Sequence, residues 1–164
     1  MKRVLIIGGG AAGMMAAVSA AWLGAGVVLL EKMPALGRKV LITGKGRCNI
    51  TNDCDIETII KNMPGNGQFL YSALNAFTNR DIIDFLENHG VPTKTERGGR
   101  VFPVSDSAQD VVEAFEKAMR ELGIEIHTGE PVKKLLTDNG IARGAVTTKG
   151  HTYEADAVVL CTGG

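Results

Sequence analysis

The chain has little cysteine, no excess of charge of either sign and no cluster of histidines, and each absence excludes a class of protein. Its three cysteines, an odd number at irregular spacing among 164 residues, argue against a disulfide framework and fit a reducing compartment. Its 18 basic and 18 acidic residues cancel, so bulk charge attracts neither nucleic acid nor an anionic membrane. We therefore expect a protein of a reducing compartment with no nucleic-acid or membrane partner.

Metal-binding patterns are also lacking. Cys48 and Cys54 are separated by five residues, which matches no common zinc pattern, and no histidine lies at ligand spacing from them. The histidines at 89, 127 and 151 are scattered, and we expect them at the surface or at strand ends. The sequence therefore predicts no metal site and no histidine base.

One long uncharged run does occur, over the 27 residues from Val4 to Leu30. Because Lys2 and Arg3 precede it, the run resembles a signal peptide or a membrane span. Six glycines interrupt it, however, and they cluster where a phosphate-binding turn needs them. We therefore interpret the run as part of a folded domain.

The first thirty residues predict a strand, a glycine turn, a helix and a second strand, in the order of a βαβ unit. The pattern G-x-G-x-x-G falls on Gly8, Gly10 and Gly13. The first glycine permits the tight turn, the second lets backbone approach a pyrophosphate, and the third lets helix and strand pack closely. Glu31, 18 residues past Gly13, has the usual spacing of a carboxylate that binds the adenosine ribose. These features predict dinucleotide binding, with the diphosphate on free N–H groups at the helix N-terminus; the alternative is a turn with only a packing role.

After Glu31 the chain departs from a plain NAD-binding domain. The next candidate for a parallel strand is 124–127, after a helix at 107–122, so that 32–105 form an excursion within one domain of residues 1–164. The excursion opens with a loop rich in glycine and cations. Its Arg38, Lys39, Lys45 and Arg47 are candidates to hold phosphates or the polar edge of a flavin, and a solvated basic loop is the alternative.

The rest of the chain predicts short helices and antiparallel strands. Residues 67–77 and 79–89 read as helices, the latter with Thr78 and Asp81 in capping-box spacing. Residues 92–96 and 99–104 form a predicted hairpin, and 131–155 a three-stranded antiparallel meander. The last predicted strand, 157–161, is fully apolar and leads to Thr162.

Together these features resemble the two-dinucleotide-binding-domain flavoproteins. More narrowly, two motifs resemble one family: Thr43-Gly44-x-Gly46-Arg47-Cys48-Asn49-x-Thr51-Asn52, and Gly99-Arg100-Val101-Phe102-Pro103. Its members are known as BaiN-type NAD(P)/FAD-dependent oxidoreductases, or aminoacetone-oxidase-family FAD-binding enzymes. The resemblance implies an α/β fold with a Rossmann-type FAD-binding domain and FAD as cofactor. It also implies NAD(P)H as co-substrate, a small-molecule substrate and a cytoplasmic protein. Because members of the family are about twice this length or more, we expect the N-terminal part of such an enzyme, incomplete at the C-terminus and inactive alone.

The resemblance also implies a set of cofactor-binding residues. Pyrophosphate contacts fall to Gly8, Gly10, Ala11, Ala12 and Gly13, and the ribose or phosphates to Glu31, Lys32, Arg38 and Lys39. The flavin side would be contacted by Thr43, Gly44, Gly46, Arg47, Cys48 and Asn49. The backbone of Val132 would face the adenine, and Thr162, Gly163 and Gly164 would pass near the pyrophosphate. No side chain is assigned as a catalytic acid, base or nucleophile, since the flavin N5 carries the hydride.

Two other functions stay open at this point. A dithiol–disulfide reductase places C-x-x-x-x-C on the corresponding loop, and the pair Cys48 and Cys54 misses that spacing by one residue. A non-catalytic dinucleotide-binding or sensing module is the other alternative. The substrate, the electron acceptor and the oligomeric state are not encoded in any pattern.

Overall fold

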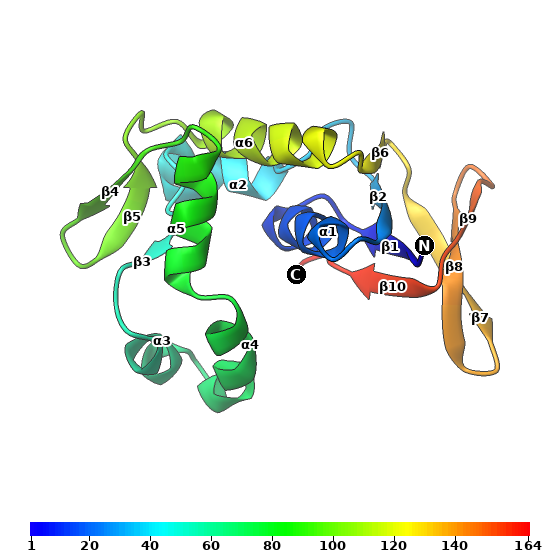
Figure 1. Cartoon of the computed structure of the whole chain (residues 1–164), viewed down its shortest axis with the longest axis horizontal. Coiled ribbons are helices and arrows are strands. Elements are labelled where there is room, and N and C mark those ends of the chain that lie inside the picture. Colours follow the sequence, from blue (N-terminus) through cyan, green and yellow to red (C-terminus); the bar gives the residue numbers. More distant parts are fainter. The chain divides into compact units, whose positions relative to one another are not determined.

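The structure is a computed structural model that describes all 164 residues (Figure 1). It divides the chain into two compact units, one made of residues 1–40 and 115–164 and the other of residues 41–114. Helix α6 (Ala108–Glu121) begins in the second unit and ends in the first.

The first unit is built on a four-stranded parallel sheet in the order β10-β1-β2-β6. Register pairs Leu5 of the first strand with Val28 on one side and Val158 on the other. The Rossmann-type α/β fold predicted from the βαβ pattern is confirmed. Its strands are β1 (Arg3–Ile7), β2 (Gly26–Glu31), β6 (Glu125–Thr128) and β10 (Ala157–Leu160).

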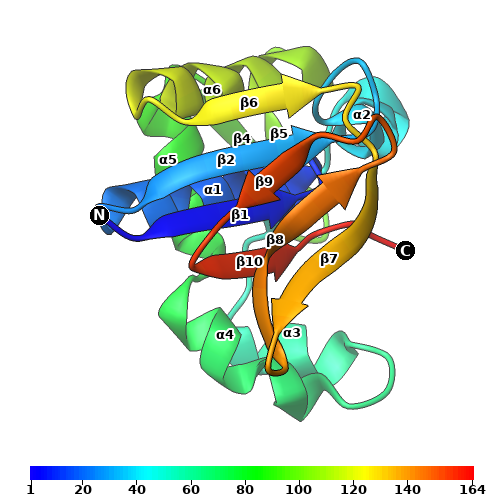
Figure 2. The same cartoon turned by 90° about the vertical axis from the view of Figure 1, so that its right-hand side faces the viewer.

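Helix α1 (Ala11–Trp22) connects β1 to β2 and lies against one face of this sheet (Figure 2). Its Met14, Ala17 and Val18 are buried. Ile6 and Leu29, at neighbouring register positions on β1 and β2, are fully buried and alternate with the residues that face the other side. Gly13 and Ala17, the smallest of the buried residues of α1, let the helix approach the two central strands closely.

The opposite face of the sheet is covered by a three-stranded antiparallel meander, as Figure 2 shows. Ala145 on its central strand is completely buried against Leu5, Ile7, Val28 and Leu30. The predicted meander is thereby confirmed, and it gives β1 and β2 apolar cover on both faces. Its strands are β7 (Val132–Asp138), β8 (Ile141–Thr147) and β9 (Thr152–Glu154).

The second unit combines short helices with a small antiparallel sheet in the order β3-β5-β4. The predicted hairpin is β4 with β5, and the predicted capping box of Thr78 and Asp81 starts α5. Its elements are η1 (Thr43–Gly46), β3 (Thr51–Asn52), α3 (Ile56–Asn62), η2 (Gly67–Leu70), α4 (Tyr71–Ala76), α5 (Asn79–Asn88), β4 (Thr93–Glu96) and β5 (Arg100–Pro103).

Besides η1, two helical segments have no counterpart in the sequence-based expectations. The cation-rich segment expected as a loop begins with one helical turn, α2 (Arg38–Ile42), which buries Val40. Helix α3 starts at Asp55, whose carboxylate accepts the Thr58 N–H at 2.7 Å and so caps the helix. None of the helices combines the length and the apolar composition that crossing a bilayer requires.

Candidate functional site

The carboxyl ends of the parallel strands bring distant parts of the sequence to one edge of the sheet. Gly8 follows β1, and its N–H donates to the carbonyl of Leu30 on β2 at 2.8 Å. Cys161 follows β10, and its N–H donates to the carbonyl of Ile7 at 2.8 Å. In doubly wound α/β domains this edge is where ligands bind.

The three glycines of the motif serve different purposes. Gly8 has a φ of +111°, and a β-carbon there would lie 2.3 Å from the carbonyl oxygen of Cys161. A β-carbon on Gly13 would lie 1.8 Å from the carbonyl oxygen of Gly8. A β-carbon on Gly10, by contrast, would meet no atom within 4 Å. The protein's own packing thus requires glycine at the first and third positions, while the second faces open space.

This open space lies at an uncapped helix N-terminus. Gly10 is the N-cap of α1, no side chain bonds to the first turn, and the first turn holds no acidic residue. The first intrahelical bond runs from the Met14 N–H to the Gly10 carbonyl at 2.9 Å, which leaves the N–H groups of Ala11, Ala12 and Gly13 without a helical acceptor. Ala11 and Ala12 are exposed. Free N–H groups and the positive end of the helix dipole make this position suited to an anion such as a diphosphate.

Glu31, at the end of β2, is fixed beside this turn. One carboxylate oxygen accepts the Gly9 N–H at 2.6 Å and the other accepts the Met33 N–H at 2.8 Å. Each oxygen has a second lone-pair direction, so the carboxylate can also accept from ribose hydroxyls. The two hydrogen bonds hold the Glu31 side chain in one position and leave its carboxylate able to accept further hydrogen bonds.

Gly9 is a site residue that the motif pattern did not single out. A β-carbon on it would lie 2.4 Å from Cδ2 of Leu36 and 3.1 Å from Cβ of Glu31. Its carbonyl also accepts the Gly37 N–H at 2.8 Å, which ties the segment after β2 to the glycine turn. The run of three consecutive glycines was the available signal.

Further predicted residues of the first unit follow β2 and β10 at or near the same edge. Lys32, Arg38 and Lys39 are exposed, and Lys39 Nζ donates to the carbonyl of Gly164. Val132, at the start of β7, is half-buried. Among the predicted residues of this unit, the structure places at the sheet edge Gly8, Gly10, Ala11, Ala12, Gly13, Glu31, Lys32, Thr162, Gly163 and Gly164.

The remaining predicted residues, 43–49, belong to the second unit. Four of these residues have left-handed backbone conformations, with φ between 56° and 87°: the consecutive Gly44, Lys45 and Gly46, and then Cys48. Cys48 is buried, and burial raises the pKa of its thiol, an effect that a hydrogen bond with Thr43 only partly offsets. A buried thiol with a raised pKa is the opposite of a reactive redox cysteine.

A buried carboxylate that no sequence pattern indicated lies in the first unit. Glu130 is 6% exposed, and it bonds Lys149 Nζ at 3.1 Å and His151 Nδ1 at 3.0 Å. Burial by itself would raise the pKa of Glu130, but the hydrogen bonds from His151 and Lys149 outweigh it and lower the pKa to about 2. The cluster joins the start of the meander to the turn between β8 and β9.

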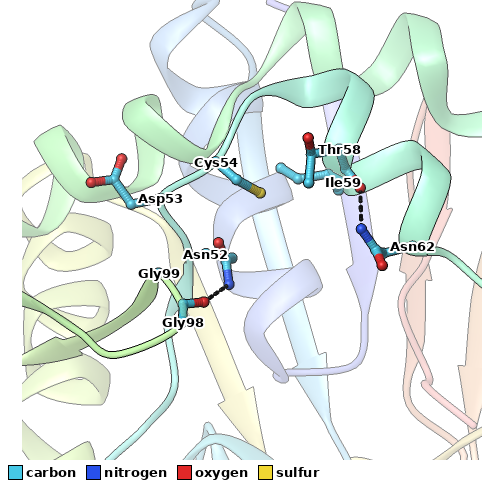
Figure 3. Close-up of a pocket in the computed structure, with 8 residues that line it drawn as sticks. All are labelled: Asn52, Asp53, Cys54, Thr58, Ile59, Asn62, Gly98 and Gly99. Atoms are coloured by element: carbon cyan, nitrogen blue, oxygen red, sulfur yellow. Dashed lines mark hydrogen bonds between the residues drawn. The ribbon is translucent and has the colours of Figure 1, made fainter.

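The second unit also contains a cavity of about 630 Å³, shown in Figure 3. The Asn52 and Asn62 side chains line it and donate to the carbonyls of Gly98 and Thr58, both at 2.8 Å, and the Cys54 sulfur points between them. The volume is typical of small-molecule sites. Its lining is Asn52, Asp53, Cys54, Thr58, Ile59, Asn62, Gly98 and Gly99.

A parallel sheet with an uncapped helix N-terminus and a fixed carboxylate at its carboxyl edge defines a Rossmann-type domain. The Rossmann domain of HI0933-like proteins matches residues 2–164, and the chain belongs to this family. The resemblance to BaiN-type proteins is confirmed by a relative from Clostridium scindens, a 3-dehydro-bile acid delta(4,6)-reductase, with 37% identity over the whole chain.

Two further comparisons agree with this placement. A ribosomal RNA dihydrouridine synthase of Escherichia coli is 32% identical over 98% of the chain. Among solved structures, the open conformation of a flavocytochrome c3 fumarate reductase is similar with a TM-score of 0.67 and 26% identity, over 99% of this chain and 34% of that one. The chain spans 39% of the length of the bile acid reductase and 39% of the length of the dihydrouridine synthase.

Proposed function

We propose that this chain is the FAD-binding part of a flavin-dependent oxidoreductase. The observation that carries the proposal is the uncapped N-terminus of α1, which faces open space above Gly10 beside the fixed carboxylate of Glu31. That arrangement offers donors to a diphosphate and acceptors to a ribose, the two groups that FAD has at this end. Family membership and a flavocytochrome relative by structure support FAD over other dinucleotides.

Different residues bind different parts of the cofactor in this proposal. The N–H groups of Ala11, Ala12 and Gly13 hold the diphosphate, and Glu31 accepts the ribose hydroxyls. Lys32, Arg38 and Lys39 add positive charge near the phosphates, and Thr162 to Gly164 pass beside them. From the family resemblance, we further propose that the backbone of Val132 contacts the adenine and that residues 43–49 contact the flavin.

When bound, FAD supplies hydride transfer through the flavin N5, with NAD(P)H as the electron donor. The chain itself binds and orients: fixed N–H groups and a fixed carboxylate hold one end of the cofactor without rearrangement. None of its side chains is assigned to proton transfer. Because residues 1–164 span only 39% of the length of the bile acid reductase and of the dihydrouridine synthase, we expect no hydride transfer from them alone.

The relatives suggest the kind of reaction. The names of the bile acid reductase and the dihydrouridine synthase both describe addition of hydrogen to an organic substrate. We propose the same class of reaction here, on a small molecule and in the cytoplasm, where the three cysteines stay free. The absence of a nucleic-acid partner stays a prediction, because the synthase acts on ribosomal RNA.

Neither alternative function is favoured by an observation. A dithiol–disulfide reductase needs a reactive thiol on the loop, and Cys48 is buried with a raised pKa. A sensing module differs from an enzyme only in turnover. An anaerobic titration of the full-length protein with NADH and NADPH distinguishes the two: an enzyme loses the flavin absorption bands on reduction, whereas a sensor that binds FAD without reacting keeps them.

A further inference from the structure

Arg47 donates to two carboxylates at once in the second unit. Its Nε and Nη2 lie 2.8 and 2.7 Å from Oδ1 of Asp106. Its Nη2 also donates to Oε1 of Glu96, and its Nη1 lies 3.4 Å from Oε2 of the same residue. An arginine has five N–H donors, so these four contacts leave its fork with little capacity for another anion.

The face of the Arg47 guanidinium is also in contact with another group, and its positive charge is neutralised. Its Cζ lies 4.2 Å from the centroid of the Phe102 ring, a cation–π contact. Lys94 Nζ lies 2.8 Å from Oδ2 of Asp106 and 3.9 Å from Oε1 of Glu96. Two cations and two anions therefore cancel, and the group has no net positive charge to attract a phosphate.

The network is attached to a loop whose backbone needs support. Lys45 and Cys48 have φ of 60°, and Asp106 has φ of 55°, in the left-handed region that non-glycine residues rarely adopt. Such residues persist where their surroundings fix them. A β-carbon on Gly44 would lie 3.1 Å from Cε1 of Phe102, so the loop packs directly on the ring that Arg47 covers.

We propose that Arg47 is a positioning residue and not a ligand of a phosphate or of the flavin edge. With Glu96, Asp106 and Lys94 it forms a clamp that holds residues 43–48 against the β4–β5 hairpin. The functional part of this inference rests on the proposed function, in which this loop lies on the flavin side. The clamp orients backbone groups of the loop through contacts that Arg47 makes on the side of the hairpin.

The two roles make opposite predictions for Asp106→Asn. Suppose instead that Arg47 is a cofactor ligand for which Glu96 and Asp106 compete. Removal of the Asp106 charge would then free the guanidinium and leave FAD binding unchanged or make it tighter. If Arg47 is a positioning residue, Asp106→Asn and Arg47→Lys both loosen the clamp, since the lysine keeps the charge but loses the fork. Both variants then weaken FAD binding.

The experiment uses the full-length protein with Arg47→Lys, Asp106→Asn and the double variant. Arg100→Lys is the control, because it makes the same exchange at an exposed position on β5 whose Nε bonds only the Arg97 carbonyl at 3.2 Å. The readouts are the FAD dissociation constant, visible-region circular dichroism of the bound flavin, and amide hydrogen exchange of residues 43–49 compared with α1.

We expect each single variant to weaken FAD binding about ten-fold or more, and the double variant to add little, as contacting residues do. Exchange of residues 43–49 accelerates while α1 and the control stay unchanged, and the flavin dichroism changes in both variants alike. Unchanged or tighter FAD binding by Asp106→Asn with weaker binding by Arg47→Lys would overturn the inference. Wild-type protein that binds no FAD would contradict the proposed function, and loop exchange unaffected by Arg47→Lys would contradict the clamp independently.

Discussion

Gly10→Val separates the folding role of the glycine turn from its binding role. The backbone at Gly10 has φ −80° and ψ −175°, which any residue adopts, and a β-carbon there meets nothing within 4 Å. The protein therefore tolerates a side chain at this position. The cost is that of a poorer N-cap, about 1 kcal/mol, which lowers the melting temperature of a protein this size by roughly 2–4 °C.

FAD binding, unlike folding, does not tolerate a side chain at position 10. The valine side chain fills the space in which a diphosphate reaches the N–H groups of Ala11, Ala12 and Gly13. Hydrogen bonds to charged groups contribute about 1.5–3 kcal/mol each. Loss of two of them weakens binding by at least about 3 kcal/mol, or more than ~100-fold in the dissociation constant.

Flavin fluorescence titration gives the dissociation constant, and thermal unfolding without FAD gives the stability. Gly13→Ala is the matched variant: its β-carbon would lie 1.8 Å from the Gly8 carbonyl oxygen, so it damages folding itself, by about 3 kcal/mol or more. Gly10→Val protein that melts normally and still binds FAD with the wild-type constant would refute the placement of the diphosphate.

The other predictions concern three acidic or sulfur-bearing side chains. Glu31→Gln should weaken FAD about ten-fold or more, since it loses charge-assisted bonds to ribose; an unchanged dissociation constant would mean that Glu31 only orders the Gly9 turn. Cys48→Ser should keep most NAD(P)H oxidase turnover in the full-length enzyme, whereas complete loss with FAD still bound would favour a redox thiol. The pKa of Glu130 is lowered from 4.5 to about 2, so its stabilisation is fully present above about pH 4.5 and is lost as the pH falls through 2. Denaturant titrations should therefore find Glu130→Gln less stable than wild type at pH 7, with a gap that closes between pH 4.5 and 2; a gap independent of pH would argue against the ionic contribution.

The parallel sheet and the meander were predictable because their strands have local sequence patterns that indicate a strand. Residues 3–7, 27–30 and 157–160 are short apolar runs next to glycine or polar turns, and the helix between the first two is rich in alanine. The boundaries in the structure differ from those predicted by only a residue or two. The capping box of Thr78 and Asp81 was likewise readable, since it depends on two positions three residues apart.

The contacts that shape the loop of residues 43–49 were not predictable, because they join residues far apart in sequence. Arg47 binds Glu96 and Asp106, which lie 49 and 59 residues further along the chain. Sequence alone made Arg47 a candidate to hold phosphates or the polar edge of a flavin, with a solvated basic loop as the alternative, and only the tertiary structure shows its two carboxylate partners. Glu130 is a similar case, since its partner His151 is 21 residues away, in the turn between β8 and β9.

The central claim is that the glycine turn and Glu31 form a site for the adenosine diphosphate half of FAD. Competition between FAD and FMN for the refolded or cofactor-stripped full-length protein tests it most directly, because FMN has the flavin but lacks the adenosine and its phosphate. The account predicts that FAD binds at least ~100-fold more tightly than FMN, since only FAD reaches both the helix N-terminus and the Glu31 carboxylate. Equal affinity for FAD and FMN, or no affinity for either, would contradict it.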